Sequence, residues 1–177
     1  SDVPAGLNQH VSDLERLCAG LGVRSLVPIG CALGGMVATS YAARHPGHLR
    51  HLVIVDAAAP KWDDTVFLFK DVFPEGMQRQ SAMQFAEALG DTDALATDLH
   101  EYFQMLFLSP ENRDRYMAIK REYGLVKSVN ELLNADFKRF DLNPELPGLR
   151  MPTLVINGRY DMNVAASVAW KIHNAIP

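Results

Sequence analysis

The feature that most constrains the fold is a tight, glycine-flanked turn between an apolar run and a run of small residues. Residues 26–29 are strand formers, Gly30 and Gly34 flank position 32, and small residues dominate the helix predicted to follow. A turn this sharp strains the backbone of its central residue, and only small residues fit two positions to either side. In the pattern G-x-S-x-G such a turn presents a serine nucleophile, but the central position here is Ala32.

The residues after this turn further limit the folds that the chain can adopt. Arg44-His-Pro-Gly47 ends the small-residue helix, and a second buried strand at 52–55 ends near Asp56. In these residues the chain resembles the α/β-hydrolase family, in the branch that carries a helical lid. The resemblance implies an α/β fold: part of a hydrolase core with a parallel sheet, and a helical cap inserted between two strands. The alternative is a generic doubly wound domain, because glycines are common in strand-to-helix turns.

The N-terminal residues also resemble an internal part of that family's sequence. Ser1-Asp2 matches the tail of a loop that precedes the first helix in such proteins, and we predict that helix at 7–21. Its apolar stripe should face the sheet. We therefore expect the first strands and the last strand of the family's sheet to lie outside this sequence.

The sequence predicts three segments. Residues 1–58 form the first part of the core, 59–148 the helical cap, and 149–177 the second part of the core with a third strand at 152–157. The middle segment is rich in aromatic residues and helix patterns, with a predicted chain break at Pro74-Glu-Gly76 and a predicted helix start at Ser109-Pro110. Further helices are predicted over 126–137 and from Asn163 onwards.

Composition limits the partners that the chain can have. The 177 residues carry a net charge of −4, which argues against nucleic acid or an anionic membrane and leaves a small-molecule substrate as the expected partner. Two cysteines and the lack of a long apolar run favour a cytoplasmic protein. The pattern contains no nucleotide-binding motif and no zinc-like spacing, so we expect neither cofactor nor metal, and the oligomeric state stays open.

The resemblance implies roles for individual residues. Ala32 occupies the nucleophile position, the Leu33 backbone N–H is an oxyanion donor, and Asp161 is the acid that orients a histidine base; Asp56 is the second choice for the acid. In this family the base follows the acid in the chain. His173 alone does so, but it falls inside a predicted helix, so we interpret it as a surface histidine and place the base outside this sequence.

The pocket and the substrate are less constrained. Cys31 is a poor substitute nucleophile, since the turn projects position 32 outward, and we expect Cys31, Trp62 and Phe103 to line a substrate pocket. The chain therefore resembles a serine hydrolase acting on an ester, lactone or amide of a mainly apolar small molecule, inactivated by alanine in place of serine. The alternatives are a natural pseudo-hydrolase that binds a small molecule and a proline iminopeptidase-like aminopeptidase.

Overall fold

The computed structural model describes residues 6–88, 102, 105–120, 136 and 138–177. The chain divides into two compact units, residues 1–66 with 126–177, and residues 67–125. Within the described ranges, none of the helices has the length and apolar character needed to cross a membrane. The predicted cap boundaries at 59 and 148 stay a prediction.

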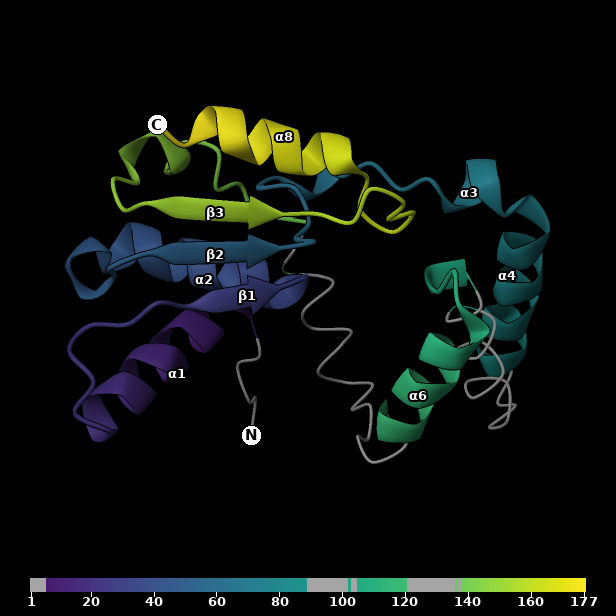
Figure 1. The fold of residues 1–177 in the computed structure, drawn as a ribbon, viewed down its shortest axis with the longest axis horizontal. Coiled ribbons are helices and arrows are strands. Elements are labelled where there is room, and N and C mark those ends of the chain that lie inside the picture. The colour runs from purple at the N-terminus through teal and green to yellow at the C-terminus, as the bar shows by residue number, and fades with distance from the viewer. Residues whose placement is uncertain (1–5, 89–101, 103–104, 121–135, 137) are drawn as a thin grey trace. The chain divides into compact units, whose positions relative to one another are not determined.

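The first unit is built on a three-stranded parallel sheet in the order β1-β2-β3 (Figure 1). Its strands are β1 (Ile29–Cys31), β2 (Leu52–Val55) and β3 (Thr153–Ile156). The second and third strands lie where the sequence predicted them. The first begins later than the predicted 26–29, because Pro28 has no N–H to give to the ladder, and Leu26 makes only an isolated bridge to Leu49.

Three α-helices of this unit lie within the described residues. Helix α2 (Leu33–Arg44) packs on β1 and β2, behind the sheet in the view of Figure 1, and α8 (Ala166–Ala175) packs against β3. Helix α1 (Leu7–Gly20) packs on α2, where the sequence predicted contact with the sheet. Leu7 and Val11 of the predicted apolar stripe are buried, whereas Leu17 and Leu21 are exposed.

The core lies between α2, α8 and one face of the sheet. Its fully buried side chains come from α2, β2, α8 and the segment that precedes β3: Tyr41, Leu52, Ile54, Leu142, Leu146, Leu149 and Val168. The segment before β3 includes the short 3₁₀ helix η3 (Leu146–Gly148), which belongs to this core even though it lies inside the predicted cap range.

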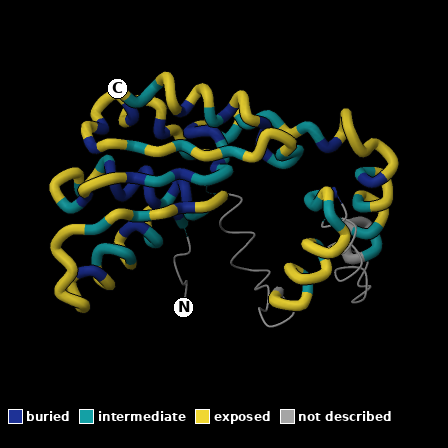
Figure 2. The backbone as a smooth tube through the Cα atoms, in the orientation of Figure 1, coloured by how far each residue is buried: buried dark blue, intermediate teal, exposed yellow. Residues whose placement is uncertain are grey.

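The other face of the sheet carries apolar side chains that stay open. The strand register aligns Ile29 with Val53 and Leu154 in one row, and Cys31 with Val55 and Ile156 in the next. Ile29 is 72% exposed, Leu154 56% and Ile156 44%, and Figure 2 shows the exposed stretches along β1 and β3. The sheet is therefore covered by helices on one face only within the described residues.

The second unit is helical where it is described. It contains α3 (Phe69–Val72), α4 (Pro74–Ala88) and α6 (Pro110–Lys120). The predicted break lies one residue before Pro74: α3 ends at Val72, and Pro74 begins α4 because proline is accepted at the first helical position, where no N–H is needed. Glu75 and Gly76 lie within α4. Ser109-Pro110 does start a helix, with the Ser109 hydroxyl accepting from the Asn112 N–H. The predicted helix at 126–137 lies almost entirely outside the described residues.

Candidate active site

Ala32 stands in a strained backbone conformation between β1 and α2. Its φ of 50° and ψ of −118° are those of a turn position that normally requires glycine. Its N–H donates to the Val55 carbonyl of β2 at 3.1 Å, and its own carbonyl accepts from the Gly35 N–H at 3.0 Å. The side chain at position 32 is thus held out from the end of the sheet and is exposed. The expected strain at the centre of the turn is present.

Gly30 and Gly35 make this turn possible, whereas the sequence pattern suggests Gly30 and Gly34. A Cβ on Gly30 would collide with the backbone of Gly34 and Gly35, and a Cβ on Gly35 would come within 2.5 Å of the Ala57 methyl group. A Cβ on Gly34 would meet no described atom within 4 Å. The expectation that Gly34 must be small is therefore wrong, because its Cβ direction points away from the strand.

Asp56 follows β2 and shares the unusual backbone of Ala32. Its φ is 44°, and these two are the only non-glycine residues with positive φ in the described parts of the chain. Its N–H donates to the Ile156 carbonyl at 2.9 Å, and its Oδ1 accepts from the Gly158 N–H at 2.7 Å. Such strain, at the carboxyl ends of neighbouring parallel strands, is typical of functional sites.

Asp161 lies in the loop that follows β3. Its Oδ1 accepts from the N–H groups of Asn163 and Val164 at 2.8 and 2.9 Å, and its own N–H donates to the Gly158 carbonyl. This bonding holds residues 161–164 in a turn, so α8 begins at Ala166 and not at the predicted Asn163. One carboxylate oxygen of Asp161 is thereby fixed in place by two backbone donors.

The structure brings Cys31, Asp56 and Asp161 together at the ends of the three strands. Partial burial beside the strand ends raises the pKa of the Cys31 thiol above its ordinary value although the residue is still exposed, and the charges of Asp56 and then Asp161 raise this pKa further. Both carboxylates therefore act on the residue beside Ala32. A thiol with a raised pKa is a poor nucleophile at neutral pH, in keeping with the interpretation of Cys31 as a neighbour of the site.

The other predicted residues lie in different surroundings. Leu33 is the first residue of α2, where backbone N–H groups have no partner within the helix. Trp62, in the 3₁₀ helix η2 (Trp62–Asp64), is half-buried in a small cluster with Leu33 and Met36. Phe103 lies outside the described residues. His173 is exposed on α8, as predicted for a surface histidine.

One group of neighbouring side chains was not predicted from the sequence. Glu15, His45 and His48 place three potential ligand atoms within 4.8 Å of one another. The spacing His45-x-x-His48 was a signal, but Glu15 is 30 residues away and only the packing of α1 on α2 brings it to the two histidines.

Comparison with known proteins identifies the family. The family model for the alpha/beta hydrolase fold matches residues 5–177. The chain belongs to the α/β-hydrolase fold family. Among other family members, it is 29% identical over 154 residues to the AB hydrolase superfamily protein YisY of Bacillus subtilis, covering 84% of this chain and 54% of that one. It is 28% identical over 175 residues to a pimeloyl-[acyl-carrier protein] methyl ester esterase of Vibrio vulnificus, with 95% and 66% covered.

A solved structure agrees with this hydrolase fold. An alpha/beta fold family hydrolase from Bacillus anthracis superposes with a TM-score of 0.80 at 19% identity, covering 100% of this chain and 66% of that one. The chain thus spans between half and two thirds of the length of these relatives. At such low identity the structural likeness shows the fold alone.

Proposed function

We propose that this chain carries the nucleophile and acid positions of a serine hydrolase that cleaves an ester, lactone or amide of a mainly apolar small molecule. The observation that supports the proposal most is the strained backbone at Ala32, which holds the side chain out from the end of the sheet and leaves it exposed. Catalysis through an acyl-enzyme needs a hydroxyl at that position, so the chain with Ala32 is expected to bind substrate without turning it over.

Asp161 is the proposed acid. Two backbone N–H groups hold its Oδ1, which leaves the second oxygen to accept from the Nδ1–H of a histidine base. Asp56 is the second candidate: its Oδ1 accepts from the Gly158 N–H and its other oxygen is also available, but the family resemblance favours the loop after β3, where Asp161 lies. The Leu33 N–H, at the start of α2, is the proposed oxyanion donor, and the positive end of the helix dipole adds to its effect.

The substrate class rests on fewer observations. Cys31, Trp62 and Phe103 are the proposed lining of the substrate pocket, and they would favour an apolar acyl or alcohol group. The Vibrio relative named above is an esterase, which favours an ester over an amide here. A proline iminopeptidase-like activity and a pure ligand-binding role are the remaining alternatives.

The experiment restores the hydroxyl in the complete protein. Ala32→Ser should give a covalent adduct with a fluorophosphonate, read as one added mass on the residue-32 peptide, together with turnover of a chromogenic ester. Adding Asp161→Asn should lower kcat by about 10⁴, because asparagine favours the wrong histidine tautomer.

Asp56→Asn in the same Ala32→Ser background is the matched control and should retain most of the turnover. If Asp56→Asn removed the activity and Asp161→Asn did not, the acid would be Asp56. Absence of both adduct and turnover in a folded Ala32→Ser protein would exclude the hydrolase proposal and favour the binding protein.

A further inference from the structure

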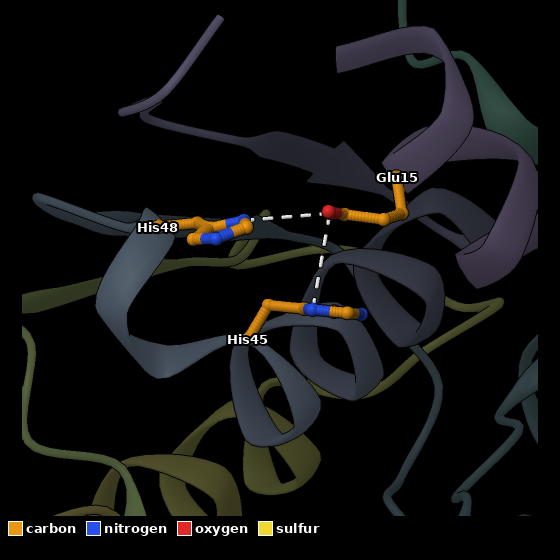
Figure 3. A group of neighbouring side chains, drawn as sticks. All are labelled: Glu15, His45 and His48. Carbon is orange, nitrogen blue, oxygen red and sulfur yellow. Dashed lines mark ion pairs between the residues drawn. The ribbon is translucent and has the colours of Figure 1, made fainter. Parts of the chain in front are cut away.

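The geometry points to a divalent transition-metal site, of the kind that Zn²⁺ occupies, formed by Glu15, His45 and His48. Glu15 comes from α1, His45 directly follows α2, and His48 lies in the 3₁₀ helix η1 (Pro46–His48). Figure 3 shows the two imidazole rings and the carboxylate pointing toward one another from these three places.

The distances match the spacing of ligands around a small cation. The Glu15 Oε2 atom lies 3.4 Å from Nδ1 of His48 and 3.8 Å from Nδ1 of His45. Two ligands of a tetrahedral zinc, each about 2.0–2.2 Å from the metal, are roughly 3.3–3.6 Å apart. The 3.8 Å separation is too long for an ordinary hydrogen bond, and the 3.4 Å separation is at the outer limit of one. All three ligand atoms lie within 4.8 Å of one another, so a cation that binds all of them requires small movements of these side chains toward it.

The chemical nature of the ligands selects the class of ion. Two imidazoles and one carboxylate are the ligand set of zinc and its neighbours, whereas Ca²⁺ and Mg²⁺ prefer oxygen ligands only. Three protein ligands leave a fourth position, which water can fill because all three side chains are partly exposed.

A buried tyrosine orients the Glu15 carboxylate of such a site through a hydrogen bond. The Tyr41 hydroxyl donates to Oε2 of Glu15 at 2.6 Å and lies 3.3 Å from Nδ1 of His48. The Tyr41 ring is tilted by 30° against that of His45, with the ring centroids 4.7 Å apart. Tyr41 is fully buried in the core, so its hydroxyl has a fixed position. Partners of this kind hold a ligand ready for the metal, and their removal weakens metal binding about 10–100-fold.

The site is distinct from the nucleophile position. Ala32 precedes α2 and His45 follows it, so the two lie at opposite ends of this helix, roughly 20 Å apart along its axis. The metal would therefore join α1 to the end of α2 and stabilise the folded chain, because an ion that binds only the native state shifts the folding equilibrium.

The test is metal binding by the complete, tag-free protein. We expect one Co²⁺ per chain, seen as the visible absorption bands of tetrahedral cobalt and displaced by Zn²⁺, and a Tm that rises with added zinc. Glu15→Gln and His48→Asn should each weaken binding at least tenfold, and Tyr41→Phe, which keeps every ligand, about 10–100-fold.

His51→Asn is the matched control, since His51 is exposed three residues beyond His48 and should leave the titration unchanged. Circular dichroism establishes whether each variant is folded. If a ligand variant is unfolded, the proposal is tested by metal affinity in the other two variants: Tyr41→Phe should weaken binding and His51→Asn should not. Absence of stoichiometric binding to the unsubstituted protein would overturn the proposal. So would binding that survives Glu15→Gln and His48→Asn, or that is lost on Cys31→Ser.

Discussion

At the scale of single residues, the turn around Ala32 depends on where each Cβ would point. Gly30 and Gly35 face the packed interior of the turn, and Gly34 faces open space. The three glycines look equivalent in the sequence, but only two are required by sterics. Ala32 itself keeps a backbone conformation that costs about 1–3 kcal/mol for a residue with a side chain.

A matched pair of alanine substitutions tests this difference. Gly30→Ala should lower the free energy of unfolding by about 2 kcal/mol or more, because its methyl group collides with backbone that cannot move without opening the turn. Gly34→Ala should be neutral or stabilising by about 0.5–1 kcal/mol, since alanine is the better helix former. Urea denaturation of both variants makes the comparison, and equal effects would show that the glycines are equivalent after all.

At the scale of elements, the three strand ends form one electrostatic environment. Asp56 follows β2, Asp161 follows β3, and both raise the pKa of Cys31 at the end of β1. With less thiolate present at a given pH, Cys31 should react slowly with alkylating reagents although it is exposed.

The double variant Asp56→Asn/Asp161→Asn tests whether the two carboxylates raise the pKa of Cys31. Removing both negative charges should lower the Cys31 pKa, so the alkylation rate at pH 8 should rise severalfold and its pH midpoint should move to lower pH. Iodoacetamide labelling read by peptide mass gives the rate, and buried Cys18 is the internal control. An unchanged rate would mean that the two carboxylates do not act on this end of the sheet.

Sequence reasoning worked where local pattern decides the structure. It placed β2, the small-residue helix and the loop of Asp161, because apolar runs and glycines report on them directly. It misplaced β1, where Pro28 interrupts the ladder, and the start of α8, where the Asp161 carboxylate competes for backbone N–H groups. It missed the cluster of Glu15, His45 and His48, which exists only because α1 packs on α2.

At the scale of the whole molecule, the sheet is asymmetric. One face packs on α2 and the core, and the other presents the open rows that contain Ile29, Leu154 and Ile156. An apolar strand surface of this kind, together with open strand edges, favours association between chains.

The 177-residue chain should therefore self-associate in a concentration-dependent way. Ile29→Thr with Leu154→Thr should reduce this association, because threonine has the β-branched shape favoured in strands and removes apolar surface. Light scattering and sedimentation measure the effect between low and high micromolar concentration. Leu142→Thr, at a buried position, is the contrasting variant and should destabilise the fold without improving solubility. A monodisperse unsubstituted chain would contradict the prediction.

The pairing of β2 with β3 also has a consequence for how the chain folds. Leu52 pairs with Thr153 and Val55 with Ile156, so roughly a hundred residues must be looped out before this ladder can form. Contacts so distant in sequence slow folding, and we expect the β2–β3 ladder to form late. The entropy of closing such a loop grows only logarithmically, by about 0.6 kcal/mol for each doubling of its length. The unit of residues 67–125, which lies between these strands and outside their core, can therefore lengthen or shorten substantially with little effect on the stability of the sheet.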